Sequence, residues 1–379
     1  MIKLLIKIIL IFIVFSIPTS AYTYNYLSSL MPNKQWRVGY YESGRVPLFN
    51  NILKSFVKQL IMDEYFPELP ASVFEIKDNK KLWNELSKIN NAKIKFVKEV
   101  YCENNWVNGG LVIRQEKIDS VLRKYKIDIV MVMGTLAAQK LIKDNNSAVF
   151  IIMGASNIYK AGVTKGKIYS GYRNVFATIN PHKYKQQMKI FHSIVEFKKL
   201  GIVYWDTPRN KTYSAIEDVE EMSKKLGFEI VSCFSNPEEM DEEKAINDLK
   251  GCYKHLAKRA DAVYITVHRS LLKHSNVYEL ALPFLKAKVP TFVQEDPRLV
   301  EHGFLMAISP ESDCQSEGRF AAQNLKKIIE GAVPGELDMR FHEKTSLYIN
   351  KEVADIIEFE VPESILMVAD KVYERIKYD

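Results

Sequence analysis

The chain has 379 residues, of which 47% are hydrophobic and 26% charged, which is typical of a globular protein large enough for two domains. Its formal net charge is +7, but the basic residues are spread along the chain and form no polybasic block. The charge therefore indicates a solvated surface and argues against nucleic acid as a partner.

The N-terminus has the pattern of a secretory signal peptide. Lys3 and Lys7 form a positive region, residues 8–15 are an unbroken apolar run, and residues 19–21 supply small side chains for cleavage after Ala21. The apolar run is shorter than the roughly 20 residues needed to span a bilayer, so a retained anchor is the weaker interpretation. With no cysteine near the cleavage site there is no lipobox, and we expect a periplasmic chain carrying a charge of +5.

A polar connector at 22–36 precedes a first series of alternating apolar strands and amphipathic helices. In chain order we expect a strand at 37–41, a helix at 47–62, strands at 93–101 and 128–133, helices at 112–125 and 135–143, and a strand at 148–153. Pro47 suits the first turn of its helix, where its missing N–H costs nothing. The stretch 66–110 is harder to place and is interpreted as a surface elaboration of the first lobe.

A second series follows after residue 199. We expect strands at 200–205, 229–234, 261–266 and 291–294, and helices at 213–226, 240–258 and 276–287. Continuous apolar strands alternating with helices predict parallel sheets covered on both faces, so two series predict an α/β protein of two doubly wound lobes. A ligand should then bind outside the carboxyl ends of the strands, in a cleft between the lobes.

The turn from Met133 to Gln139 is the strongest candidate site. An apolar strand leads through Gly134 and Thr135 directly into a helix, where Thr135 could cap the helix and the first-turn N–H groups could bind a carboxylate. A plain capped turn with nothing bound is the alternative.

Other strand ends carry polar side chains that could face the same ligand. Residues 154–157 are small and polar, although they could equally form a lobe-crossing loop. The loop 206–210 lies between Trp205 and Tyr213, which could stack on a planar group, or it could be an ordinary turn. Glu295 or Asp296 could receive an ammonium group, or both could be solvated. The candidate ligand-binding residues are Arg45, Gly134, Thr135, Ala137, Ala138, Ser156, Asn157, Asp206, Thr207, Asn210, Tyr213, His268, Glu295 and Asp296.

Catalytic and metal-binding signatures are largely missing from the sequence. It contains no G-x-S-x-G elbow, Walker A loop or HExxH motif, and the seven histidines are scattered. We therefore expect no catalytic residues, no metal and no cofactor. The four cysteines allow three pairings, free thiols, or a single bridge such as Cys233–Cys252.

With these loops identified, the chain resembles the periplasmic substrate-binding proteins of ABC transporters, in the family that includes binding proteins for tryptophan and other aromatic amino acids. The resemblance rests on the segments 38–40, 128–130, 134–139, 201–204, 224–227, 260–264, 289–292, 328–331, 347–350 and 361–363. It implies a type I periplasmic-binding fold with crossings near Gly171, Gly303 and Lys344. The first lobe would comprise 37–170 and 304–343, and the second 171–303 and 344–379.

The resemblance also implies a function without enzymatic activity. It places the turn of Thr135, Ala137 and Ala138 at the carboxylate of an amino acid or other small carboxylate, bound by a monomer that serves an ABC permease. Residues 266–269 depart from the family's Pro-Thr-Asp-Asn-like loop, so aromatic specificity is not carried over, and His268 with Arg269 would change the charge of the pocket. A periplasmic sensor module and an exported hydrolase are the alternatives.

Overall fold

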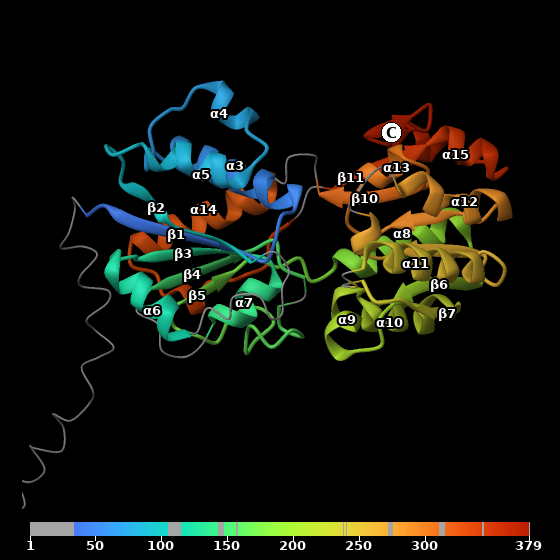
Figure 1. Ribbon diagram of the computed structural model, residues 1–379, viewed down its shortest axis with the longest axis horizontal. Coiled ribbons are helices and arrows are strands. Elements are labelled where there is room, and N and C mark those ends of the chain that lie inside the picture. Colours follow the sequence, from blue (N-terminus) through green and yellow to red (C-terminus); the bar gives the residue numbers. More distant parts are fainter. Residues whose placement is uncertain are drawn as a thin grey trace, which may run out of the picture.

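The computed structural model describes residues 34–104, 115–142, 148–156, 158–237, 239, 241–271, 276–310, 315–342 and 345–378. These residues form two α/β lobes (Figure 1). The expected signal peptide, most of the connector, Asn157 and Cys314 lie outside the described residues. Among the described helices, none combines the length and apolar character that crossing a membrane requires.

A five-stranded parallel sheet of order β2-β1-β3-β4-β5 forms the first lobe. Its strands are β1 (Trp36–Glu42), β2 (Ile94–Glu103), β3 (Ile129–Met133), β4 (Val149–Met153) and β5 (Val175–Ala177). Its helices are α3 (Pro47–Met62), α4 (Ala71–Glu75), α5 (Asn79–Ser87), α6 (Gln115–Lys124), α7 (Thr135–Leu141) and α14 (Gln315–Ile329), followed by the short η4 (Pro334–Glu336). Every residue of β3 and β4 is buried, as expected for strands covered on both faces.

Helix α14 belongs to the first lobe despite its late position in the chain. Its residues Ala321, Ala322 and Leu325 are buried in the first-lobe core, and the helix packs against α3. Gly318 permits this close approach, because a Cβ there would lie 2.4 Å from the carbonyl oxygen of Ile52.

The second lobe contains a seven-stranded sheet of order β12-β11-β10-β9-β8-β6-β7, in which β10 and β11 are antiparallel. Its strands are β6 (Lys199–Tyr204), β7 (Glu229–Phe234), β8 (Ala262–Ile265), β9 (Thr291–Val293), β10 (Met306–Pro310), β11 (Thr345–Asn350) and β12 (Lys371–Tyr373). Its helices are α8 (Lys183–Val195), α9 (Pro208–Tyr213), α10 (Ile216–Leu226), α11 (Glu242–Leu256), η2 (Arg269–Leu271), α12 (Val277–Ala287), α13 (Arg298–Glu301), α15 (Lys351–Ile356) and α16 (Glu363–Val368). Two apolar clusters cover the sheet.

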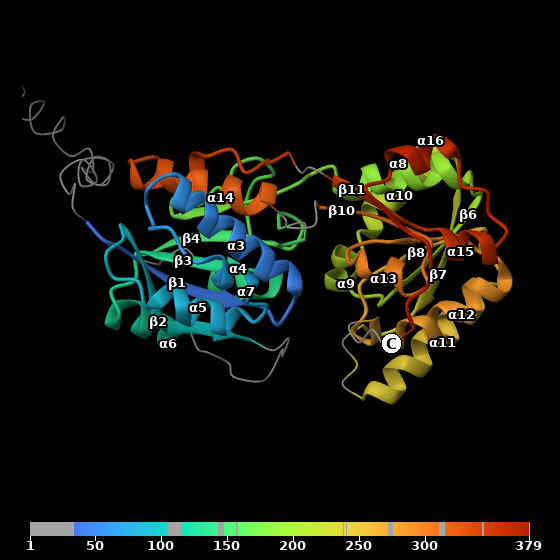
Figure 2. The same ribbon diagram turned by 90° about the horizontal axis from the view of Figure 1, so that it is seen from above.

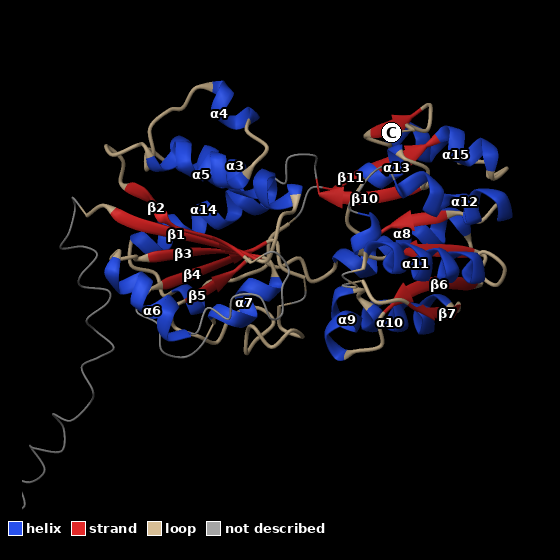
Figure 3. Cartoon of the chain, viewed as in Figure 1, coloured by secondary structure: helices blue, strands red, loops and turns tan. Residues whose placement is uncertain are grey.

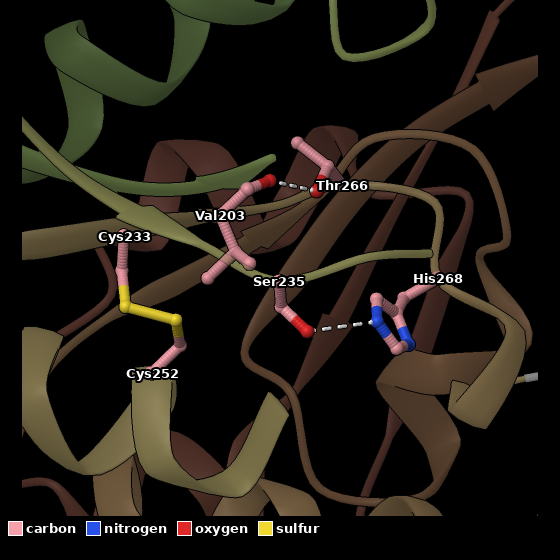
Figure 4. The surroundings of a disulfide bond; sticks show 6 residues. All are labelled: Val203, Cys233, Ser235, Cys252, Thr266 and His268. Carbon is pink, nitrogen blue, oxygen red and sulfur yellow. Dashed lines mark hydrogen bonds between the residues drawn. A yellow bond between two sulfur atoms is a disulfide. The ribbon is translucent and has the colours of Figure 1, made fainter. Parts of the chain in front are cut away.

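A disulfide joins Cys233 on β7 to Cys252 on α11 (Figure 4). This is the pairing named from the sequence as one possibility, and it ties an edge strand to the helix that covers it. Cys102 is a free, half-buried thiol.

The crossings between the lobes differ from those expected. The first was placed near Gly171, but β5 still pairs with β4 in the first sheet, so the chain leaves this lobe after Ala177. The second was placed near Gly303, whereas β10 continues in the second sheet as far as Pro310. Both glycines adopt positive φ (75° and 123°), which marks local bends and not hinges. The third, near Lys344, lies outside the described residues.

Two expected elements also need correction. The helix expected at 213–226 begins later, at Ile216 after Ala215 with φ 52°, and Tyr213 instead ends the separate helix α9. The stretch 66–110 is not a surface elaboration, since it contains β2 and contributes the fully buried Trp83, whose Nε1 donates to the carbonyl of Val97 at 3.0 Å. Short helices with few apolar positions gave this stretch little periodicity to detect.

Candidate ligand-binding site

The two sheets point their carboxyl ends toward each other. In Figure 3 the arrows of the first-lobe strands run toward the second lobe, and the arrows of β6 and β10 run toward the first. Figure 2 shows the segment after β5 passing from the first lobe toward the second. Loops at carboxyl ends of open parallel sheets are where α/β proteins bind ligands.

The turn between β3 and α7 is built around Gly134 and Ser43. Gly134 has φ 86°, and a Cβ there would lie 2.6 Å from the Oγ of Ser43. The Ser43 hydroxyl donates to the carbonyl of Met133 at 3.1 Å and accepts from the Ala137 N–H at 3.0 Å. The prediction that Thr135 caps α7 is therefore wrong: Gly134 is the N-cap, and a serine from the end of β1 supplies the missing oxygen.

Thr135 instead holds the next loop. Its Oγ1 accepts from the backbone N–H of Ser156 at 3.0 Å and donates to the Ser156 carbonyl at 3.2 Å. Thr135 is buried, with 5% of its surface exposed. Two candidate positions from separate strand ends are thus joined directly within the first lobe.

Tyr184 extends this contact into the second lobe. The Ser156 hydroxyl hydrogen-bonds to Tyr184, whose OH donates to Oε1 of Glu295 at 2.8 Å. Lys183 binds the other oxygen of Glu295 at 2.8 Å. Burial, followed by the charge of Glu295, raises the pKa of Tyr184, so this hydroxyl keeps its proton. Thr135, Ser156 and Glu295 therefore belong to one network that connects the lobes.

The acidic candidates are all paired with cations of the protein. Glu295 binds Lys183, and Asp206 lies 2.6 Å from the Nζ of Lys211. Arg298 reaches both carboxylate oxygens of Asp296. Contact of any of these carboxylates with a ligand ammonium stays a prediction, and it would compete with an existing ion pair.

Two further buried polar side chains lie on α9 and directly after β9. Thr207 caps the helix, accepting from the Asn210 N–H at 3.2 Å and from its Nδ2 at 2.9 Å. The Oδ1 of Asn210 is buried without a hydrogen-bond partner among the described residues, as is the Oε1 of Gln294. Gln294 is anchored by its Nε2, which donates to the Tyr213 carbonyl at 2.9 Å. Unpaired buried acceptors are costly, so both oxygens call for a donor from solvent or ligand.

His268 is buried in the second lobe and does not add charge to it. Its Nε2 lies 3.2 Å from the Ser235 hydroxyl and its Nδ1 accepts from the Ser270 N–H at 3.2 Å (Figure 4). Burial lowers the pKa of His268 to about 4, so the ring is neutral at pH 7. His268 therefore brings no positive charge at pH 7, because a ring this deeply desolvated releases its proton, and the change in pocket charge relative to the family's acidic loop stays a prediction.

Three apolar side chains are exposed at the carboxyl end of the second sheet. Trp205 follows β6, Phe234 ends β7 and Val267 lies two residues after the end of β8, and they are 41%, 52% and 48% exposed. The ring of Phe234 packs edge-on against Tyr204. Large side chains exposed together at such a position are consistent with a contact surface.

The remaining candidates contribute less to this arrangement. Arg45 is largely exposed and binds both oxygens of Glu103 at the end of β2, at 2.8 and 3.0 Å. Ala137 and Ala138 are buried in α7. Asn157 lies outside the described residues. Two basic surface grooves, one over α5 and β2 and the other between α8 and α10, contain none of the candidates.

Sequence reasoning missed Ser43, Tyr184 and Glu317. Ser43 follows the first strand and could have been noticed by that position alone. Tyr184 lies on α8, which was not expected, and Glu317 lies on a helix distant in sequence from the loop that it contacts. Their roles depend on tertiary contacts.

Comparisons with known proteins agree with this architecture. Residues 103–373 match the family described as ABC transporter substrate binding protein. Comparison with curated proteins gave no match. A conserved domain protein from Vibrio cholerae is similar in structure, with a TM-score of 0.65 and 17% identity over 89% of this chain and 100% of that one.

Two other solved structures are similar over nearly the same extent. An ABC domain from Streptococcus pneumonia in complex with L-Trp gives a TM-score of 0.63 at 17% identity, covering 89% of this chain and 100% of that chain. The ligand-free, open form of a substrate-binding protein with adhesive properties from Clostridium difficile gives 0.62 at 18% identity, covering 90% and 100%. At these identities the likeness establishes the type I periplasmic-binding fold.

Proposed function

The chain belongs to the ABC transporter substrate-binding protein family, whose members are solute-binding proteins and not enzymes, and from this premise we propose that it is the exported solute-binding protein of an ABC importer. It captures an amino acid or another small carboxylate between its lobes and presents the closed form to a permease. The observation that carries this proposal is the network from Thr135 through Ser156 and Tyr184 to Glu295, because it joins both lobes at their facing strand ends.

The first lobe receives the carboxylate of the ligand. Ser43 occupies the Ala137 N–H, and the Thr135 hydroxyl is engaged by Ser156, so the N–H groups of Thr135 and Leu136 are the donors that the start of α7 offers. Backbone N–H groups at a helix start favour an anion. In this proposal Thr135 acts mainly by holding the Ser156 loop beside those donors.

The second lobe receives the apolar and donor-bearing parts of the ligand. Trp205, Phe234 and Val267 offer an apolar surface, and the acceptors of Asn210 and Gln294 suit N–H or O–H donors. The similar protein from Streptococcus pneumonia was solved with L-Trp, a carboxylate that also has a planar apolar part. L-Tryptophan is therefore a rational first ligand to test.

Export is supported by two independent features. The N-terminal residues 1–21 have the signal-peptide pattern, and Cys233 and Cys252 form a disulfide. Disulfides persist in oxidising compartments such as the periplasm and are rare in the cytosol.

A thermal-shift screen of the mature chain tests the proposal. The panel comprises L-tryptophan, other amino acids, small carboxylates, sugars and nucleosides. A ligand at about 100 times its Kd stabilises the folded state by about 2.7 kcal/mol, which raises Tm by a few degrees in a protein of this size. Stabilisation by sugars or nucleosides alone would contradict the proposed carboxylate class.

Variants of Thr135 identify the site. Thr135→Asp should abolish binding, because it places a negative charge beside the anion and cannot donate to the Ser156 carbonyl. Thr135→Ser keeps both hydrogen bonds and is the matched control, with affinity near wild type. Unchanged affinity in Thr135→Asp would remove this turn from the site.

A further inference from the structure

Glu317 lies in the first turn of α14 and connects three segments that are distant in sequence. Its side chain is buried, with 8% of the residue exposed. The Oε1 atom accepts from the Gly154 N–H at 2.7 Å and accepts a short hydrogen bond from the Thr178 hydroxyl. One carboxylate oxygen thus binds the loop after β4 and the segment after β5.

The first of these segments belongs to the proposed ligand site. Gly154 ends β4 and opens the loop to Ser156, which is held by Thr135. Gly154 has φ 60°, and a Cβ there would lie 2.8 Å from the ring of Phe49, so this turn requires glycine. This backbone conformation of Gly154 directs its N–H toward Glu317.

The second segment is the base of the first crossing. Thr178 directly follows β5, and its N–H donates to the Ile152 carbonyl at 3.0 Å. The next residue, Ile179, pairs with the segment after η4: its N–H donates to the carbonyl of Met339, and its carbonyl accepts from the N–H of Phe341. Glu317 therefore lies where the connections leave the first lobe.

A carboxylate suits this task. Burying one is costly unless it is hydrogen-bonded, and hydrogen bonds to a charged acceptor are roughly twice as strong as neutral ones. An apolar side chain of the same length would fill the space but would leave the Gly154 N–H and the Thr178 hydroxyl without this acceptor. The contact thus holds the loop and the crossing in a fixed relation that packing alone would not enforce.

We propose that Glu317 is a positioning residue of the binding site, which fixes the Gly154–Ser156 loop to the base of the first crossing so that a ligand on the loop acts directly on the hinge. The link to ligand binding rests on the proposed function. The fixed relation itself is a property of the ligand-free protein and can be measured there.

Hydrogen exchange of the ligand-free mature chain tests the proposal with Glu317→Met, Glu317→Gln and Gln323→Ala. In Glu317→Met the Gly154 amide loses its acceptor, and the Thr178–Ile179 segment loses the restraint through the Thr178 hydroxyl, so the amides of both segments should exchange roughly tenfold faster or more. Glu317→Gln keeps an acceptor oxygen and should restore most of the protection. Gln323 is exposed on the same helix, so its variant should match wild type.

Two outcomes would overturn the proposal. Equal acceleration of amides throughout α3 and the first-lobe core would mean that Glu317 only contributes to global stability. Acceleration in one segment without the other, or in neither, would mean that the carboxylate does not join them. If L-tryptophan binds, its affinity should also fall on the order of fivefold or more in Glu317→Met and stay unchanged in Gln323→Ala. Failure of the whole ligand panel would count against the proposed function. It would not count against the role of Glu317 in joining the two segments, because the exchange measurement uses no ligand.

Discussion

The two lobes share a doubly wound design but differ at the ends of their sheets. In the first lobe, several polar groups at the carboxyl ends are bonded to one another: Ser43 caps α7, Thr135 holds Ser156, and Glu317 holds Gly154, while the Nδ2 of Asn104 after β2 is buried without a partner among the described residues. In the second lobe, apolar side chains are exposed at the same position, and the oxygens of Asn210 and Gln294 are buried without partners among the described residues.

Because of this difference, we expect the two lobes to contribute to ligand binding in different ways. A first lobe whose loops are fixed in advance can present backbone donors without reorganisation, which lowers the cost of binding. A second lobe with exposed rings and unpaired acceptors gains most when a ligand and the opposing lobe cover it. Differential contact of this kind is what shifts an open population toward a closed one.

Gly134→Ala should have the largest effect on stability, because it disrupts the turn between β3 and α7 in the first lobe. The residue would adopt φ 86° and ψ 161°, a region that is nearly restricted to glycine, and its Cβ would clash with Ser43 and Phe49. Strain and overpacking together should lower the free energy of unfolding by about 4 kcal/mol. Chemical denaturation measures this.

Gly162→Ala is the matched control for that prediction. Gly162 also has positive φ, 71°, but no atom lies within 4 Å of its added Cβ. Its cost should be about 1 kcal/mol, from backbone strain alone. Equal losses in the two variants would contradict the steric account of the Gly134 turn.

Acidification should weaken the second lobe through His268. The folded-state pKa is about 4, below the ordinary value of 6.5, so between these values the unfolded chain binds the proton and the folded chain does not. Stability from this group is complete above pH 6.5 and falls by about 3 kcal/mol as the pH drops to 4. The free energies of unfolding of wild type and His268→Gln should differ by a constant above pH 7 and converge below it. A difference independent of pH would show that the ring is not buried as neutral imidazole.

Removal of the disulfide should loosen the second lobe without altering the first. Cys233 and Cys252 are 19 residues apart, and closing a loop of this length contributes about 3 kcal/mol in the chain-entropy model. In Cys233→Ser with Cys252→Ser, hydrogen exchange should accelerate in β7 and α11. Equal acceleration in β3 and β4 would show that the lobes unfold as one unit.

Trp205→Ala should have the smallest effect on stability, within about 0.5 kcal/mol, because the residue lies at the surface with 41% of its area exposed. Its effect on ligand affinity should be larger, since truncation removes a contact surface of the second lobe. Lys225→Ala, on the far part of α10, serves as a neutral control in the same titration. A normal affinity in Trp205→Ala would remove this ring from the contact surface.

Sequence patterns predicted the buried strands well, because β3, β4 and β8 are apolar runs bounded by turn signals. The bounds of α3 were also predicted, with Pro47 marking its start. The late strands β10 to β12 and the helix α8 were not assigned, since their partners are distant in sequence or their periodicity is weak. The crossings predicted near Gly171 and Gly303 were misplaced because glycines at positive φ mark bends in general, and a bend need not be a hinge.

The sequence predicted which residues lie near the site better than it predicted what each of them does there. Thr135, Ser156 and Glu295 were selected as residues at strand ends, and they do belong to one network. Their partners within the protein depend on tertiary packing: Thr135 caps nothing, Glu295 is already paired, and Tyr184 and Glu317 had no local signal. The position of a residue in the sequence indicates whether it lies near the site, but only the fold determines which groups it contacts there.

The most direct test of the central claim is hydrogen exchange of the mature chain with and without the best ligand from the screen, beginning with L-tryptophan. Capture between the lobes predicts simultaneous protection of the turn at 134–138 and of the strand ends at 204–210 and 265–268. Protection confined to one lobe, or to the basic grooves outside these strand ends, would contradict it.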